Sequence, residues 1–439
     1  DSVAQTWGRA GIGGWRMDVA PDIDNGRDPQ NIYWETFRAV VRRLNPETAI
    51  ISEEWGDAAE MLQGDEFDST MNYRLRTAIL GFARDTDFTD NDTNGDRTIR
   101  VLTARGFDDM VRAIEEDYPR PAYLALMNLL GSHDTSRLLF AADNDKQVQR
   151  LAALAQFTLP GAPTVYYGDE IALDAPSQDD NGVFQDDPYN RAPYPWPDET
   201  GDHYPPPDED MLAFYQTLGR LRRDHPALRQ GEMHTLLAEE PSDVYVFARL
   251  DREAGDAALV ALNRGRQAQT VTLDLAGRLP AGLTLAAAFG GATLTTGAGP
   301  VTLELPAKAG DAWTAAGDPA IFAAPEPPSD VTADGGNAQA VIAWEPVADA
   351  AGYLVYRSPV AEGGFQPLFS QPITATTYTD AAAANGFVYY YAVASVSASG
   401  MVGALSPSAR AVPAFALDDA FYAGETTELR EVELAYGVT

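Results

Sequence analysis

Residues 14–20 read GWRMDVA, a short apolar run that ends by presenting an acid, Asp18. Two further apolar runs end in the same way: IISEEW carries Glu53, and NLLGSHD carries Asp134. Barrel enzymes place their catalytic groups at the carboxyl ends of parallel strands. We therefore expect the three acids to form one site.

Strand-like and helix-like segments alternate over residues 1–228, which is typical of an α/β layer or barrel. Apolar runs predict five strands, at residues 12–18, 49–52, 67–71, 125–130 and 163–167. Helices are predicted at residues 32–44, 108–116, 147–159 and 211–223. The acidic stretch after the third strand reads as irregular, and the acids of the second helix are poorly placed for burial. A closed eight-stranded barrel needs three more strands, so residues 1–228 form either an open α/β layer or part of a (β/α)8 TIM barrel.

The pattern changes near residue 229. Short strands separated by glycine and charge predict an all-β antiparallel sandwich over residues 229–318, followed by a proline-rich linker at residues 319–328. In residues 329–414 apolar and polar residues alternate along short predicted strands. Trp344 is expected in the core, and a tyrosine-rich strand lies near the end. This segment resembles a fibronectin type III domain, a β-sandwich. Residues 415–439 are a tail or the start of a further domain.

Bulk composition limits the partners of this 439-residue chain. Its formal charge of -34 repels nucleic acid and anionic membrane surfaces, which excludes both as expected partners. No stretch reaches the roughly 18 apolar residues that span a membrane. Cysteine is absent, which excludes disulfides and thiolate metal sites. The chain opens without a basic-then-apolar signal, in what reads as the tail of a helix, so we expect its natural beginning to lie elsewhere.

The three acid motifs, in this order, resemble the α-amylase family, glycoside hydrolase family 13. They correspond to the ends of its fourth, fifth and seventh barrel strands, which implies that the partial barrel comprises strands 4–8. Two further stretches fit, YYGDE at residues 166–170 and DPYNR at residues 187–191. Residues 56–58 and 67–73, GDA and FDSTMNY, are typical of the neopullulanase, cyclomaltodextrinase and amylopullulanase group. The resemblance covers about residues 1–315.

The resemblance implies retaining hydrolysis of α-glucosidic bonds in starch, pullulan or cyclodextrins. Asp18 then matches the nucleophile, Glu53 the acid/base and Asp134 the acid that grips sugar hydroxyls. Arg16 would keep Asp18 ionised, because it lies two residues earlier on the same strand face. Glu54 competes for the acid/base role. Adjacent strand residues point to opposite faces, so only one of the two can face the site, and the motif selects Glu53.

Other substrate contacts follow from the same resemblance. Asp187 and Arg191 match residues that bind sugars on the non-reducing side of the cut bond. His133 would add a hydrogen bond to the same ring as Asp134. Trp55 either stacks on a sugar face or belongs to the core. The implied partner is an α-glucan polysaccharide or oligosaccharide.

No cofactor is required by this chemistry, and calcium is left open. Residues 90–96 begin like a calcium loop with oxygen ligands at alternate positions, which makes Asp90, Asp92, Asn94 and Asp96 weak metal candidates. Val101 occupies the position of the glutamate that would complete such a loop. A solvated acidic turn is the alternative interpretation.

Three functions stay open. The first is a secreted or cell-surface bacterial enzyme that cuts α-1,4 bonds, with α-1,6 bonds as a further option. The second is a transferase of the same family, such as a branching enzyme or a glucanotransferase. The third is a non-catalytic glucan-binding surface protein. The family's first motif has no match in this chain, so we expect an amino-terminal part of the same enzyme to precede it, and the chain alone to be inactive or weakly active.

Overall fold

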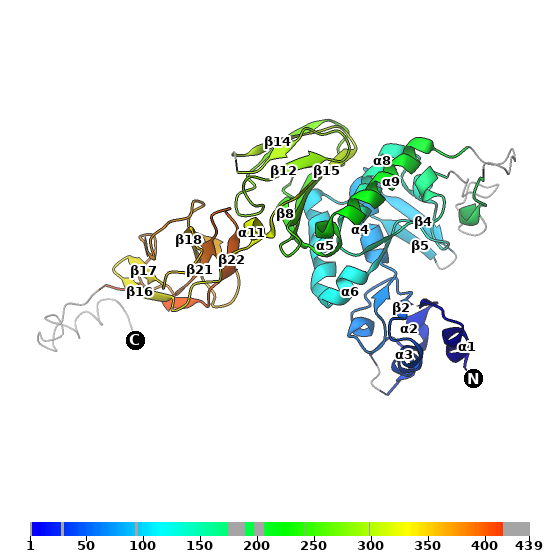
Figure 1. Cartoon of the computed structure of the whole chain (residues 1–439), viewed down its shortest axis with the longest axis horizontal. Helices are drawn as coiled ribbons and strands as arrows, with labels where there is room; N and C mark the ends of the chain where they lie inside the picture. Colours follow the sequence, from blue (N-terminus) through cyan, green and yellow to red (C-terminus); the bar gives the residue numbers. More distant parts are fainter. Residues whose placement is uncertain are drawn as a thin grey trace, which may run out of the picture. The chain divides into compact units, whose positions relative to one another are not determined.

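The computed structural model describes residues 2–27, 30–92, 95–173, 189–196, 206–240, 242–297 and 299–415, apart from the side chains of residues 90–97 and 189. The chain forms two compact units (Figure 1). The first unit comprises residues 1–275 and 282–319, and the second comprises residues 276–281 and 320–439. Along the described residues, no helix combines the length and the apolar character needed to cross a bilayer.

Parallel strands form the first part of the first unit. Strands β1 (Gly14–Met17), β2 (Ala49–Ser52) and β3 (Ser69–Thr70) pair in parallel in chain order. A parallel bridge between Met71 and Met127 leads on to the parallel pair β6 (Met127–Leu129) and β7 (Ala162–Thr164). The five predicted strands are therefore confirmed. The carboxyl ends of all five strands lie on one side, because the strands run in the same direction.

Helices separate most of these strands, as the sequence predicts. The longer ones are α3 (Tyr33–Leu44), α4 (Tyr73–Ala83), α5 (Ala104–Asp117), α8 (Lys146–Thr158) and α9 (Glu209–Asp224). The short helices are α1 (Val3–Arg9), α2 (Ala20–Ile23), α6 (Arg120–Ala125), α7 (Leu138–Ala141), α10 (Pro226–Gln230) and the single turns η1 (Glu60–Leu62), η2 (Asp169–Ile171) and η3 (Tyr189–Arg191). A hairpin of β4 (Phe88–Asp92) and β5 (Gly95–Ile99) lies between α4 and α5.

Two expectations for this region are wrong. The stretch after the third strand is not irregular, because it contains α4, which is capped by Asn72 and buried on nearly every side. Nine of its eleven residues are buried, so the helix shows little of an amphipathic stripe. The acids of α5 are not all exposed either. Asp108 is buried, where it pairs with Arg112 at 2.8 Å and accepts a hydrogen bond from the Tyr245 hydroxyl at 3.0 Å.

The rest of the first unit is antiparallel, which confirms that part of the prediction. A curled six-stranded sheet has the order β13-β12-β15-β10-β9-β8, and β11 pairs with β14 separately. Their bounds are β8 Glu232–Leu237, β9 Val244–Asp251, β10 Asp256–Asn263, β11 Gln269–Leu273, β12 Thr284–Ala287, β13 Leu294–Thr295, β14 Val301–Leu305 and β15 Ala309–Ala316. One apolar core joins this sheet to the helices, since the ring of Phe107 in α5 lies 4.7 Å from Phe82 in α4 and 5.0 Å from Tyr245 in β9.

The second unit consists of two antiparallel sheets. One has the order β16-β17-β20, and the other has the order β19-β18-β21-β22 with β23 also on β21. Trp344 is buried as predicted, with its ring 5.4 Å from Tyr353 in a core that includes Tyr391. The bounds are α11 Pro319–Phe322, β16 Thr332–Gly336, β17 Gln339–Ala343, β18 Gly352–Ser358, β19 Gln366–Pro367, β20 Thr377–Asp380, β21 Tyr389–Val396, β22 Val402–Leu405 and β23 Ala409–Ala411. The predicted tail lies outside the described residues beyond residue 415.

Candidate active site

Asp18 is the first residue after β1, at the start of a strained turn. The next residue, Val19, has φ 39°, in the left-handed region that a β-branched side chain rarely adopts. Such a conformation costs on the order of 1–3 kcal/mol and persists only where surrounding contacts fix it. One such contact is present, because the Val19 N–H donates a hydrogen bond of 2.8 Å to Oε2 of Glu53. The turn that presents Asp18 is thus held by a second acid of the site.

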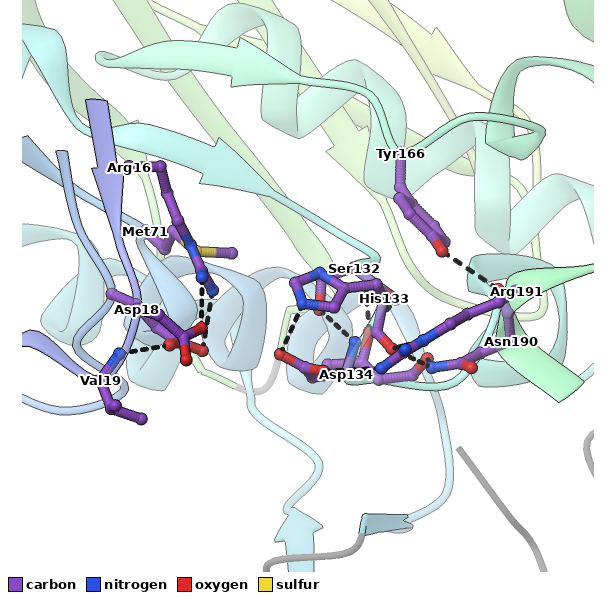
Figure 2. A network of polar contacts seen from close by, with 12 residues as sticks. Arg16, Asp18, Val19, Met71, Ser132, His133, Asp134, Tyr166, Asn190 and Arg191 are labelled. Carbon is purple, nitrogen blue, oxygen red and sulfur yellow. Dashed lines mark hydrogen bonds and ion pairs between the residues drawn. The ribbon is translucent and has the colours of Figure 1, made fainter. Parts of the chain in front are cut away.

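Arg16 connects the two acids from the strand itself. Its Nη1 lies 2.5 Å from Oδ1 of Asp18 (Figure 2). Its Nη2 lies 3.1 Å from Oε1 of Glu53. The hydrogen bond from Arg16 is the largest influence on the pKa of Asp18, which is lowered. Burial opposes this shift, whereas the charge of Arg16, a hydrogen bond with Glu53 and the charge of His133 add to it. Asp18 is therefore ionised at neutral pH, as a nucleophile must be.

Glu53 and Glu54 lie in different surroundings although they are adjacent. The Glu53 side chain is only 4% exposed, and its Oε1 accepts a hydrogen bond of 3.3 Å from Nε1 of Trp55. Glu54 instead accepts a hydrogen bond of 2.6 Å from the N–H of Gly56 in its own loop. Glu53 is thus the acid that faces Asp18.

Trp55 contributes to the site through a neighbouring tyrosine. Its indole stacks on the ring of Tyr73, with centroids 3.6 Å apart and planes 7° apart. The Tyr73 hydroxyl lies 3.1 Å from Oγ of Ser132, and burial raises the pKa of this hydroxyl. Tyr73 therefore ties the loop after β2 to the loop after β6. One face of Trp55 is taken up by Tyr73, and sugar stacking by Trp55 stays a prediction.

Asp134 lies in the loop after β6 between two basic side chains. Its Oδ2 lies 3.1 Å from Nε2 of His133, and its Oδ1 lies 3.3 Å from Nη2 of Arg191 (Figure 2). The Asp134 N–H donates to Oγ of Ser132 at 3.1 Å. The Asp134 side chain is 26% exposed, so it can still reach a ligand. These contacts fix the carboxylate in place.

Asn190 was missed by sequence reasoning, although it lies within the DPYNR stretch. It is fully buried, and its Nδ2 donates to the backbone oxygens of His133 at 2.6 Å and Thr135 at 3.0 Å. The Tyr166 hydroxyl donates to the Asn190 carbonyl at 3.3 Å. Asn190 therefore holds the loop that carries Asp134. An asparagine between turn-forming residues suggests only a turn from sequence, so the flanking motif was the one available signal.

Electrostatic coupling joins the two halves of the site. The charge of His133 acts on Asp18, and the charges of Glu53 and Asp134 both act on the Tyr73 hydroxyl. Figure 2 shows His133 and Asp134 across from Asp18. The structure thus brings the three predicted acids together at the ends of β1, β2 and β6.

Other predicted residues cannot be placed. Asp187 lies outside the described residues, as do the side chains of the weak calcium candidates Asp90, Asp92, Asn94 and Asp96. Of this candidate loop, residues 90–92 belong to β4 and residues 95–96 to β5.

Asp169 is an acid near the site with a separate role. It follows β7, is buried beside Gly131, and burial raises its pKa to about 7, while the charge of Arg137 opposes that shift. A Cβ atom on Gly131 would lie 3.1 Å from its carboxylate. Asp169 therefore packs under the Asp134 loop.

Comparisons with known proteins agree with this geometry. The family profile described as "Alpha amylase, catalytic domain" matches residues 1–231. The chain is 32% identical over 429 residues to an amylopullulanase of Thermoanaerobacter thermohydrosulfuricus, covering 92% of this chain and 27% of that protein. It is 38% identical over 270 residues to a cyclomaltodextrinase of a Bacillus species, covering 61% of this chain and 42% of that protein.

A solved structure is also similar. The debranching enzyme of Nostoc punctiforme in its native form matches with a TM-score of 0.57 and 29% identity, over 72% of this chain and 60% of that one. The chain thus spans less than half the length of the two curated relatives named above. The match of the catalytic-domain profile covers more than half of the chain and includes all three acids. This chain therefore belongs to the α-amylase family of glycoside hydrolases.

Proposed function

We propose that this chain carries the catalytic acids of a retaining α-glucan hydrolase. Asp18 attacks the anomeric carbon and forms a glycosyl ester, while Glu53 gives its proton to the departing glycosidic oxygen as the C–O bond breaks. Glu53 then removes a proton from water, which attacks the same carbon and releases Asp18. The sugar keeps its α configuration because it is inverted twice.

The observation that carries the proposal is the Arg16 bridge. One guanidinium contacts both carboxylates, at 2.5 Å for Asp18 and 3.1 Å for Glu53. Retaining enzymes hold their two carboxyl groups about 5–5.5 Å apart, whereas inverting enzymes need about 6.5–9.5 Å to admit a water molecule. The bridge favours the shorter separation.

Asp134, His133 and Arg191 form the substrate-binding side of the proposed site. The Asp134 carboxylate would accept hydrogen bonds from sugar hydroxyls and stabilise the positive charge that develops on the ring. His133 and Arg191 would donate to the same sugar from either side of it. We retain Asp187 as a proposed ligand on the non-reducing side, and Trp55 as a proposed wall of the sugar site.

The proposed substrates are α-1,4-linked and α-1,6-linked glucans of the starch, pullulan or cyclodextrin type. The names of the relatives, amylopullulanase and cyclomaltodextrinase, support this choice. We also propose a secreted or cell-surface location, and a fibronectin type III-like spacer at residues 329–414. A transferase of the same family is the second candidate, and adding an acceptor sugar separates the two through the products formed. A non-catalytic binder has no need of the Arg16-bridged acid pair.

The five parallel strands are, in this proposal, strands 4–8 of a (β/α)8 barrel that an amino-terminal part of the same enzyme completes. This chain covers only 27% of the amylopullulanase and 42% of the cyclomaltodextrinase, which supports this view. The chain alone is then inactive or weakly active. Rapid, saturable pullulan hydrolysis by residues 1–439 alone would contradict this part of the proposal.

The test compares Glu53→Gln with the matched neighbour Glu54→Gln in the enzyme that includes the upstream part. Removing a general acid lowers turnover about 10²- to 10⁴-fold, so Glu53→Gln should lose that much activity on pullulan. With α-maltosyl fluoride as the substrate, the rate of the first step, in which the C–F bond breaks, should fall much less, because fluoride leaves without a proton. Glu54→Gln should stay close to the unchanged enzyme on both substrates. Equal losses for the two variants would refute the assignment.

A further inference from the structure

A second group of acids lies behind the turn that carries Asp18. Asp24 ends α2, Glu35 lies in the first turn of α3, and Glu66 lies in the loop before β3. One carboxylate oxygen from each of the three side chains lies within 4.8 Å of the other two. The acids come from three separate segments, so the fold and not local sequence gathers them.

Each of these three side chains has one buried carboxylate oxygen without a hydrogen-bond partner. Asp24 is 3% exposed and Glu66 is 4% exposed, and neither Oδ2 of Asp24 nor Oε2 of Glu66 has a hydrogen-bond partner. Oε2 of Glu35 is buried and unpartnered as well. Arg38 passes close by, but it donates to the Glu66 backbone oxygen and pairs with Asp68 at 2.8 Å. In the part of the chain that the structure describes, no ion pair reaches the three acids. Leaving buried carboxylates unpaired is costly.

The surrounding backbone holds the acids in this position. The Trp34 indole N–H donates to the carbonyl oxygens of both Ala20 and Asp24, at 3.1 Å each. The Gly26 N–H donates to Oδ1 of Asp24 at 3.1 Å, which leaves Oδ2 as the oxygen without a hydrogen-bond partner. Gly26 has φ +74° and lies against Glu60, where a Cβ atom would come within 3.0 Å of the backbone. Packing therefore imposes the gathering of like charges.

We propose that Asp24, Glu35 and Glu66 bind a calcium ion. Calcium takes carboxylate oxygens at about 2.3–2.6 Å, so two ligands on opposite sides of the ion are up to about 5 Å apart, which the measured spacing fits. Magnesium requires shorter bonds of about 2.0–2.1 Å and a stricter octahedron. Zinc prefers nitrogen and sulfur ligands, and this cluster has neither. Water and carbonyl oxygens would complete the calcium shell.

Ion binding has a structural consequence for the site around Asp18. The ion would join the end of α2, the start of α3 and the loop before β3. Helix α2 begins immediately after the strained Val19. Calcium would thus stabilise the segment that follows Asp18. The site is distinct from the candidate loop at residues 90–96, and it can be tested by binding, independently of any catalytic activity.

The test measures calcium binding and thermal unfolding of the 439-residue chain after treatment with a chelator. Glu66→Gln removes one ligand charge, and the control Asp65→Asn removes the charge of the exposed neighbour. We expect calcium to raise the melting temperature of the unchanged chain by several degrees, and Glu66→Gln to weaken calcium binding by about tenfold or more, because affinity depends on ligand charge. Asp65→Asn should change the affinity by less than about threefold, as its carboxylate is not a ligand.

The sign of the stability change adds a second criterion. Without calcium, Glu66→Gln should melt at the same temperature as the unchanged chain or higher, because one of three crowded charges is gone. With calcium, it should melt lower. Unchanged calcium affinity in Glu66→Gln would overturn the proposal, as would magnesium stabilising the chain as strongly as calcium. Glu66→Gln could also melt above the unchanged chain by the same amount with and without calcium. That result would mean that bound protons neutralise the three acids, and it would overturn the proposal.

Discussion

Replacing Asn190 with alanine tests how the loop around Asp134 is held. The substitution removes two hydrogen bonds, to the backbone oxygens of His133 and Thr135. The His133 oxygen keeps the hydrogen bond from Nε of Arg191 at 3.1 Å, so only the Thr135 oxygen loses the donor described for it. Because Asn190 is fully buried, water cannot replace its amide without entering the packed loop.

The expected cost follows from these contacts. Two neutral hydrogen bonds contribute about 1 kcal/mol each, and a buried carbonyl without a partner costs about 1–3 kcal/mol. The free energy of the lost hydrogen bond to Thr135 and the cost of leaving the Thr135 carbonyl unpaired are partly the same quantity. We therefore expect a destabilisation of about 2–4 kcal/mol. That corresponds to a fall in melting temperature of roughly 3–6 °C for a unit of about 300 residues.

Asn45→Ala is the matched control. The Asn45 side chain accepts a single hydrogen bond of 3.0 Å from the N–H of Glu47, in an exposed turn. It should cost less than about 1 kcal/mol. Calorimetry measures both variants, and hydrogen exchange at the amides of residues 132–135 should become faster in Asn190→Ala alone. Equal costs for the two variants, or unchanged exchange in the loop, would refute this view of the loop.

Three further predictions concern other parts of the first unit. Burial raises the pKa of Asp169 from 3.8 to about 7. The unfolded chain therefore releases this proton first, and stability should fall as pH rises from about 4 to 7, by at most about 4 kcal/mol. Asp169→Asn should remove that part of the pH dependence in urea unfolding. Arg16→Met should raise the pKa of Asp18, because its main hydrogen bond is lost, and shift the acidic limb of kcat/KM to higher pH. Phe107→Ala should cost about 3–5 kcal/mol in denaturant unfolding, because Phe107 is fully buried against Phe82.

The strands and the three acids could be predicted from the sequence because each signal is local. An apolar run of four or five residues that ends in an acid marks both a buried strand and the end of the barrel where side chains meet. Local geometry implied only that one of Glu53 and Glu54 faces the site, and the choice of Glu53 came from the resemblance of the motif. Both residues follow the end of β2 at Ser52, and the structure places their side chains in different surroundings.

The rest depends on distant contacts. Helix α4 was missed because burial on nearly every side leaves little of the polar face that marks a helix in sequence. Asp108 looked exposed because two of its three partners, Thr235 and Tyr245, lie on strands far along the chain. Only Arg112 lies in the same helix. The gathering of Asp24, Glu35 and Glu66 likewise depends on how α2, α3 and the loop before β3 pack, which no periodicity shows.

The residue that becomes covalently attached to sugar tests the central claim most directly. In Glu53→Gln, α-maltosyl fluoride can still transfer its sugar, since fluoride needs no proton, but hydrolysis of the ester lacks its base. The reaction breaks the C–F bond and forms a bond between the anomeric carbon and a carboxylate oxygen. Mass spectrometry of peptides from the enzyme that includes the upstream part should then find one maltosyl group on Asp18. A maltosyl group on any other acid, or a first product of β configuration from the unchanged enzyme, would contradict the account.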